Sequence, residues 1–224
     1  MELMKAIETR HSVRQYTDRA IDGETERALR EEIERCNRES GLHLQLCLRE
    51  PNAFGNGMAR YGAFRNVCNY IALVGKKGPG LDERCGYYGE RLVLRAVQLG
   101  LDTCWVALNY SKKKTACAVA PDEKLLCVIA VGYGAQPGAA HKVRPLDALC
   151  RVEGGVPLPD WFRRGMEAAQ RAPTAMNQQK FLFTLRGDIV DAKALTGFYT
   201  KLDLGIAKYH FACGAGAGNW KWAR

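Results

Sequence analysis

The stretch Arg10-His11-Ser12-Val13-Arg14 stands where a short apolar-periodic helix, beginning near residue 3, is predicted to end. The guanidiniums of Arg10 and Arg14 are four positions apart and can grip a phosphate or a planar carbonyl edge through forked donors. His11 and Ser12 add shorter donors between them. The stretch predicts an anion-binding segment, and a solvated basic turn on the surface is the alternative.

A second polar stretch, Ala172-Pro173-Thr174-Ala175-Met176-Asn177-Gln178-Gln179, follows a predicted helix late in the chain. Together the two stretches form the pair R-x-S-x-R and A-P-T-x-x-N-x-Q, which resembles the flavin-dependent nitroreductase family. The A-P-T loop lies in the last quarter of the chain rather than the first, and this order is most similar to the TM nitroreductase subgroup. The resemblance covers most of the chain.

Two further segments carry the resemblance. Residues 99–105 are similar to the family's helix-to-strand turn against the flavin, and two cations follow the strand that ends near Tyr133. The resemblance implies that FMN is the cofactor. The cofactor-binding residues that it implies are Arg10, His11, Ser12, Arg14, Thr103, Cys104, Trp105, Lys142, Arg144, Pro173, Thr174, Ala175, Met176, Asn177 and Gln179.

Each part of FMN needs a different partner. The resemblance puts residues 10–12 near the phosphate and ribityl chain, Arg14 near the ribityl chain and the N1/C2 edge, and Lys142 and Arg144 at the phosphate. These cations suit a phosphate of about −1.5 to −2 charge. A cation beside N1 would also stabilise the reduced, anionic flavin.

The A-P-T loop is expected along the edge of the flavin ring. Its proline fixes the turn, Thr174 and Asn177 can donate or accept hydrogen bonds, and Gln179 is placed to reach the pyrimidine edge. Met176 departs from the family, which usually has a small residue there. Its side chain is expected to narrow the space beside the ring.

The function implied is an FMN-dependent oxidoreductase that uses NAD(P)H to reduce a nitroaromatic, a quinone or a similar small acceptor. The flavin carries this chemistry, so no side chain is assigned as catalytic. The alternative is a flavin-binding or regulatory module without turnover, which Met176 and the lack of a recognisable nicotinamide motif favour.

Charge and composition narrow the class of partner. The 33 Lys and Arg against 24 Asp and Glu give a net charge of +9, which suits nucleic acid, an acidic membrane surface or phosphorylated small molecules. The basic residues are scattered, and the densest run, Lys112–Lys114, has no interleaved aromatics. No apolar run approaches the ~20 residues of a membrane span. A small-molecule partner is expected, without nucleic acid or membrane.

The nine cysteines contain no C-x-x-C pair, so no metal site is expected. Free cysteines within apolar runs, together with an N-terminal stretch too polar for a signal peptide, predict a cytoplasmic protein. The run Gly214–Gly218 follows a predicted helix with G-x-G-x-G spacing, so it fails as a dinucleotide fingerprint. It is predicted to be a flexible turn before the C-terminal tryptophans.

The hydrophobic spacing predicts helices and strands of an α+β protein. The resemblance implies a nitroreductase-like fold with a central mixed sheet flanked by helices. His43 is expected at the surface, His210 as a hydrogen-bonded core residue, and Phe54 and Tyr61 in a loop that docks on the body or covers the flavin. Helices are predicted over 24–38, 82–100, 111–119, 160–171 and 201–213, and strands over 42–48, 67–75, 103–108, 125–131 and 181–185.

A weak internal repeat is also visible. Helix 24–38 with strand 42–48 resembles helix 160–171 with strand 180–186, as two similar halves of one chain would. We expect a single FMN-binding domain over residues 1–224 with a seam near 133–158. The halves would form an internal pseudo-dimer holding one FMN, as a monomer or within a homodimer. The alternative is a chance recurrence, because helix-loop-strand units are common in α+β proteins.

Overall fold

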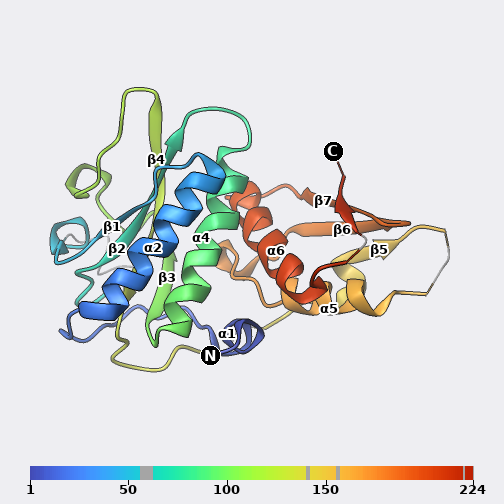
Figure 1. The fold of residues 1–224 in the computed structure, drawn as a ribbon, viewed down its shortest axis with the longest axis horizontal. Coiled ribbons are helices and arrows are strands. Elements are labelled where there is room, and N and C mark those ends of the chain that lie inside the picture. Colours follow the sequence, from blue (N-terminus) through green and yellow to red (C-terminus); the bar gives the residue numbers. More distant parts are fainter. Residues whose placement is uncertain (56–62, 140–141, 155–156, 219, 224) are drawn as a thin grey trace. The chain divides into compact units, whose positions relative to one another are not determined.

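The computed structural model describes residues 1–55, 63–139, 142–154, 157–218 and 220–223 (Figure 1). The chain divides into two units, and each is described by itself. Unit 1 consists of Met1, Thr9–Leu81 and Arg91–Ala140. Unit 2 consists of Glu2–Glu8, Asp82–Glu90 and His141–Arg224. The α+β class is confirmed, and the strands belong to two four-stranded sheets, of which only the second is mixed.

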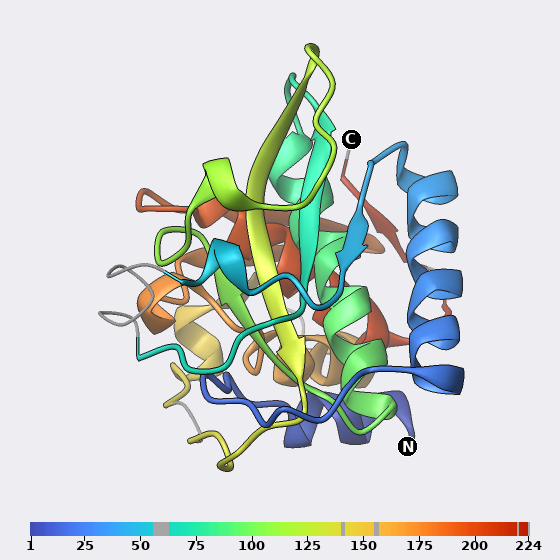
Figure 2. The ribbon, with the colours of Figure 1, turned by 90° about the vertical axis from the view of Figure 1, so that its left-hand side faces the viewer.

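Unit 1 contains an antiparallel sheet with the strand order β1-β2-β4-β3. Its two inner strands are buried along almost their whole length, which explains their near-continuous apolar sequence. The short edge strand β1 lies beside α2 (Figure 2). The elements of this unit are α2 (Gly23–Ser40), β1 (Gln45–Cys47), η1 (Pro51–Ala53), β2 (Tyr70–Lys76), the last part of α4 (Leu81–Gln98), β3 (Asp102–Val106), η2 (Lys112–Lys114) and β4 (Glu123–Gly132).

Helix α2 follows from its sequence pattern. Leu29, Ile33 and Cys36 recur at helical spacing and are buried. Gly41 ends the helix because its φ of 68° lies in the left-handed region, where its N–H reaches the Asn37 carbonyl at 2.9 Å. The helix predicted over 24–38 is thereby confirmed.

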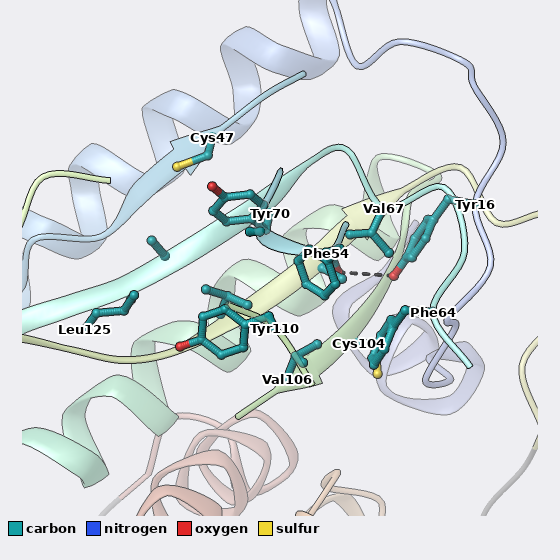
Figure 3. Close-up of a cluster of buried hydrophobic side chains, with 14 of the residues drawn as sticks. Tyr16, Cys47, Phe54, Phe64, Val67, Tyr70, Cys104, Val106, Tyr110 and Leu125 are labelled. Carbon is teal, nitrogen blue, oxygen red and sulfur yellow. Dashed lines mark hydrogen bonds between the residues drawn. The ribbon is translucent and has the colours of Figure 1, made fainter. Parts of the chain in front are cut away.

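One face of this sheet carries a cluster of buried apolar side chains (Figure 3). Tyr70 comes from β2, whereas Val13, Tyr16, Phe54 and Tyr110 come from segments outside the strands. Phe54 therefore docks on the body, as one of the two sequence interpretations expected, and Tyr61 lies outside the described residues.

Unit 2 contains the sheet β5-β6-β7-β8, with parallel pairs at both edges and an antiparallel pair in the middle. Helices α5 and α6 pack against each other, and α6 contacts the two middle strands. The elements of this unit are most of α1 (Leu3–Thr9), the first part of α4, η3 (Leu146–Ala148), β5 (Cys150–Val152), α5 (Asp160–Ala169), η4 (Ala175–Asn177), β6 (Phe181–Arg186), β7 (Ile189–Ala194), α6 (Thr200–Ala215) and β8 (Lys221–Trp222).

The C-terminal segment is part of the core of unit 2. The Phe211 ring lies 5.3 Å from Trp220 and 5.4 Å from Trp222, and it stacks on Phe183 at 5.1 Å. Lys221–Trp222 pairs with β7 as a strand. The predicted flexible turn before these tryptophans is wrong over the part of 214–218 that continues α6, because apolar packing holds the segment at both ends.

Within unit 2, α4 and α6 cross at glycines. A Cβ added to Gly86 would lie 2.1 Å from the Leu202 carbonyl, and one added to Gly205 would lie 2.0 Å from the Glu83 carbonyl. No side chain fits at either position. The two helix backbones can therefore approach closely at these glycines.

A fully buried histidine joins three helices of this unit. His210 Nδ1 lies 3.0 Å from the Ala168 carbonyl, and Nε2 lies 2.8 Å from a carboxylate oxygen of Glu90. Because the carbonyl can only accept, Nδ1 carries a proton, and the second ring nitrogen shares one with Glu90. The expectation of a hydrogen-bonded core histidine is confirmed.

Two local predictions in unit 1 are wrong. The helix expected over 111–119 is only the 3-10 turn η2, because no apolar stripe follows the lysines and Gln45 binds the backbone of Ala118 in an extended course. The single buried face expected for 42–48 holds for Leu42 and Leu44 but then reverses, since Cys47 is buried. His43 keeps a 43% exposed side chain beside Glu123, as expected of a surface histidine.

The two helix-strand pairs do not occupy equivalent places in their sheets. Strand β1, which follows α2, is an edge strand in an antiparallel sheet. Strand β6, which follows α5, is an inner strand with one parallel and one antiparallel neighbour. The internal pseudo-dimer stays a prediction. No helix in the described parts of the chain is long and apolar enough to cross a membrane.

The glycine crossing gives a stability prediction. Gly205→Ala should lower the free energy of unfolding by about 1–3 kcal/mol, because its methyl group would overlap a backbone carbonyl and force the two helices apart. Urea unfolding followed by circular dichroism measures the change. Gly55→Ala is the matched control, since its added Cβ would meet nothing closer than 3.7 Å. Equal unfolding midpoints for the two variants would contradict the crossing.

Candidate functional site

The sequence-predicted segment 10–14 lies directly against the start of β3. Ser12 forms an isolated parallel bridge with Thr103, and the Val13 N–H donates to the Thr103 carbonyl at 2.9 Å. Two groups of expected site residues, 90 positions apart in the sequence, are thus joined by backbone pairing within unit 1. The segment is therefore attached to the sheet of unit 1, while Arg14 stays exposed, and whether it binds an anion remains a prediction.

The opposite side of the segment is held by the chain that follows β4. The Thr17 N–H donates to the Tyr133 carbonyl, and the Ala135 N–H donates to the Gln15 carbonyl, each at 2.8 Å. A Cβ on Gly138 would come within 2.4 Å of the His11 Cβ, so a side chain at this position would displace the segment. Residues 10–17 are therefore positioned from two directions.

Tyr16, which the sequence interpretation left out of the site, anchors the segment to the sheet. Its buried hydroxyl donates to the Val13 carbonyl at 2.7 Å and lies 3.3 Å from the Ala130 carbonyl of β4 (Figure 3). Burial, with smaller effects of Cys104 and Asp102, raises the pKa of Tyr16 well above its usual value. The hydroxyl thus remains a donor across the whole physiological range.

The two arginines of the motif act on the same thiol. Burial raises the pKa of Cys104, and Arg14, Arg10 and a hydrogen bond from Ser12 oppose that rise. Arg10 is buried, with 4% of its surface exposed, whereas Arg14 is exposed. Both guanidiniums therefore contribute positive potential near the start of β3.

The three expected residues of β3 do not share one face. Cys104 points into the cluster of Figure 3, so the alternation of a strand puts Thr103 and Trp105 on the opposite face. Thr103 is 1% exposed and Trp105 is partly exposed. A single flat ligand could contact only part of this trio through side chains.

In unit 2 the side chain of Gln179 is fully engaged with the protein. Its Oε1 accepts from the Arg144 N–H at 2.8 Å, and its Nε2 donates to the Lys142 carbonyl at 2.9 Å. Asn177 donates to the same Lys142 carbonyl at 2.8 Å and lies 3.0 Å from the Gln179 amide. The structure thus brings Lys142, Arg144, Asn177 and Gln179 together, with the Gln179 amide bound to backbone rather than open to a ligand.

The A-P-T loop has an unusual backbone. Met176 and Asn177 each have a φ of 52°, and Gln179 has a φ of 47°, so three residues in a run of four are left-handed. Each such conformation costs of order 1–3 kcal/mol and persists only where neighbours impose it. Pro173 is buried, Thr174 and Ala175 are half-buried, and Met176 is 94% exposed. The loop therefore presents an apolar side chain outward from a strained turn.

Asp203 on α6 accepts hydrogen bonds from this loop. The sequence interpretation did not include it among the site residues. It is 2% exposed, and its two carboxylate oxygens accept from the Ala175 N–H at 3.0 Å and from the Gln178 side chain at 2.8 Å. Burial raises the pKa of Asp203 to about 6, although both hydrogen bonds lower it. An acidic residue on the buried side of a predicted helix was the signal that could have identified it.

Three of the expected cofactor-binding cations, one in unit 1 and two in unit 2, are exposed. Arg14, Lys142 and Arg144 are exposed, and none of them pairs with a carboxylate among the described residues. A cation without a carboxylate partner is suited to attract a phosphate-bearing ligand. The part of the chain that the structure describes holds no cluster of three His, Cys, Asp or Glu residues suited to a metal ion.

The comparisons with known proteins agree on one family. The family described as "Putative TM nitroreductase" matches residues 2–215. A Thermotoga maritima structure described as a "putative nitroreductase" has 22% identity and a TM-score of 0.63, covering 96% of this chain and 83% of its own. No curated protein matches the chain.

Two smaller structures share part of the fold. A "putative nitroreductase in complex with FMN" from Desulfovibrio desulfuricans has 21% identity and a TM-score of 0.50, covering 66% of this chain and 94% of its own. A nitroreductase family protein from Streptococcus pneumoniae has 14% identity and a TM-score of 0.52, covering 66% of this chain and 98% of its own. Identities this low establish the common fold alone.

Tyr16→Phe tests how firmly the first segment is held. The variant should lose about 1 kcal/mol of stability, since it deletes a buried hydrogen-bond donor and leaves the Val13 carbonyl without it. Hydrogen exchange of the Val13 amide should become faster, because that amide is bonded within the same segment. Tyr199→Phe, outside this segment, is the control. An unchanged exchange rate would show that Tyr16 does not anchor the segment.

Proposed function

We propose that this chain, which belongs to the TM nitroreductase family, is an FMN-dependent oxidoreductase. NAD(P)H is the reductant, and the acceptor is a nitroaromatic, a quinone or a similar small electrophile. The observation that carries the proposal is the pairing of residues 10–14 with the start of β3, where two guanidiniums act on one thiol. The likeness to the Desulfovibrio structure, described as an FMN complex, supports the choice of cofactor.

In unit 1, Arg10, His11 and Ser12 would hold the phosphate and ribityl chain, and Arg14 the N1/C2 edge of the flavin. Forked guanidinium donors suit both the phosphate and a planar carbonyl edge. The burial of Arg10 strengthens its electrostatic interaction with an anion, because little water screens it. Thr103, Cys104 and Trp105 would contribute through the backbone that pairs with this segment.

In unit 2, Lys142 and Arg144 would bind the phosphate, with their backbone fixed by Gln179. Pro173, Thr174, Ala175, Met176 and Asn177 would form the loop along the ring edge. Gln179 would contribute to cofactor binding indirectly, because its amide fixes the backbone of Lys142 and Arg144. Its amide is already hydrogen-bonded, so we assign the pyrimidine edge to the loop backbone instead.

FMN supplies reversible two-electron chemistry when bound, so the protein need only bind the ring, orient it and exclude water. No side chain is assigned as acid or base. None of the nine cysteines, all of which lie in the described part of the chain, is in a disulfide, which suits the reducing cytoplasm that we propose as the setting. A flavin-binding module without turnover is the second candidate, and the 94% exposed Met176 beside the proposed ring edge favours it.

The proposal is tested by anaerobic reduction. Purified protein loaded with FMN should be yellow, lose its flavin absorbance when NADH or NADPH is added, and recover it with a nitroaromatic or quinone. If the protein binds FMN but neither NADH nor NADPH bleaches the bound flavin, the oxidoreductase proposal is rejected. The second candidate, a flavin-binding module without turnover, would then stand. Titration of the protein with FMN should saturate at one FMN per chain. Repeating the titration at protein concentrations that favour the monomer and the dimer tests whether a homodimer is needed.

Arg10 should be required for cofactor affinity. Arg10→Ala should weaken FMN binding by roughly 2–4 kcal/mol, because it removes a buried cation from an anionic ligand, and Arg10→Lys should restore only part of this for lack of the fork. Fluorescence quenching of FMN gives the dissociation constants. Arg38→Ala, an exposed arginine at the end of α2, is the control. A dissociation constant equal to that of the control would remove residues 10–14 from the proposed site.

A further inference from the structure

The loop 174–179 holds its left-handed backbone only with support from elsewhere in unit 2. Inside the loop, the Asn177 N–H donates to the Thr174 carbonyl at 2.9 Å, and the Gln179 N–H donates to the Thr174 hydroxyl at 3.0 Å. These bonds fix the loop on itself, but they do not attach it to a rigid element. Strain of this kind persists where surrounding structure over-determines the backbone.

Asp203 makes that attachment. Its carboxylate receives one hydrogen bond from the loop backbone at Ala175 and a second from the loop side chain of Gln178, one on each oxygen. Gln178 also donates to the Phe198 carbonyl at 2.5 Å, so both of its amide protons are used. Asp203 lies in the first turn of α6, which is packed on α5. The loop is thus tied to helix α6 as well as to the Lys142 carbonyl, which Asn177 and Gln179 reach.

We propose that Asp203 is a positioning residue for the cofactor: it holds the loop 174–179 in the strained conformation that binds FMN. The inference rests on the proposed function, since it assumes that this loop contacts FMN. Asp203 itself need not touch the ligand. Its carboxylate is suited to the role because it has two acceptor oxygens, one for each of the two donors. No other side chain of similar size has two acceptor oxygens.

The pKa of Asp203 is determined by its burial and by its two hydrogen bonds, not by neighbouring charged groups. Glu83 on α4 pairs with Lys208 at 2.6 Å, and Lys201 and Lys208 are the nearest cations along the chain before and after Asp203. No charged group of α4, α5 or α6 is among the causes of the raised pKa of Asp203, about 6. Protonation converts one acceptor oxygen into a hydroxyl, so the hold on the loop should weaken below about pH 6.

The test compares Asp203→Ala, which removes both acceptors, with Asp203→Asn, which keeps one. Hydrogen exchange of the Ala175 amide is measured without any ligand, and FMN dissociation constants are measured from pH 5 to pH 8. Asp160→Asn, whose side chain is 84% exposed in the first turn of α5, is the matched control. FMN phosphate also titrates near pH 6, but the ratio of variant to wild-type affinity cancels that effect.

The expected result is graded. In Asp203→Ala both the exchange rate and the dissociation constant at pH 7.5 should rise about tenfold or more, the factor that 1.4 kcal/mol represents, with a smaller rise in Asp203→Asn. The affinity ratio of Asp203→Asn to wild type should approach one near pH 5, because wild-type Asp203 is then itself protonated and also keeps one acceptor oxygen. A purely structural role would give a ratio that does not change with pH.

Other outcomes overturn one proposal or the other. Unchanged exchange at Ala175 would overturn the role of Asp203 whether or not FMN binds. A wild-type protein that does not bind FMN would reject the proposed function, while the exchange rates still report whether Asp203 holds the loop. If the Asp203 variants do not fold, Gln178→Met breaks the same link from the loop side, and an affinity unchanged in that variant would overturn the inference.

Discussion

The hydrogen bond from the Val13 N–H to the Thr103 carbonyl is the interaction on which the candidate site of unit 1 depends. It sets the register between a segment without secondary structure of its own and a strand of a buried sheet. The Tyr16 hydroxyl and the close approach of Gly138 hold the same segment through further contacts. Backbone pairing is well suited to this task because it leaves the side chains of Arg10 and Arg14 to other partners.

In unit 2, hydrogen bonds again hold the expected site segments in place, but here they come from side chains instead of backbone pairing. Gln179 binds the backbone on both sides of Val143, and Asp203 binds the backbone of the strained turn at Ala175. Buried polar groups are costly unless paired, so once paired they fix the geometry of whatever they hold. Neutral amides and one carboxylate thus hold the chain in place, while Lys142 and Arg144 remain exposed.

The sequence predicted long elements well and short ones poorly. Helices such as α2 and α4 repeat an apolar pattern over five turns, whereas β5 and β8 have three and two residues, and only their partner strands make them strands. The motif residues 10–14 and 173–179 could be found by resemblance. Asp203 and Tyr16 belong to no motif, and their partners lie 28 and 114 positions away, so the sequence could at most mark Asp203 as an acidic residue on a buried helix face.

Substitutions of the buried polar groups that position the backbone and substitutions of the exposed cations should have different effects. Removing a buried amide or carboxylate leaves donors unsatisfied, so it changes stability and any ligand affinity together. Removing an exposed cation such as Lys142 leaves the fold intact, since it has no carboxylate partner among the described residues, and alters only the attraction for an anion. Arg10 lies between these cases because it is both charged and buried. Its contribution to folding must therefore be measured before its contribution to binding can be assigned.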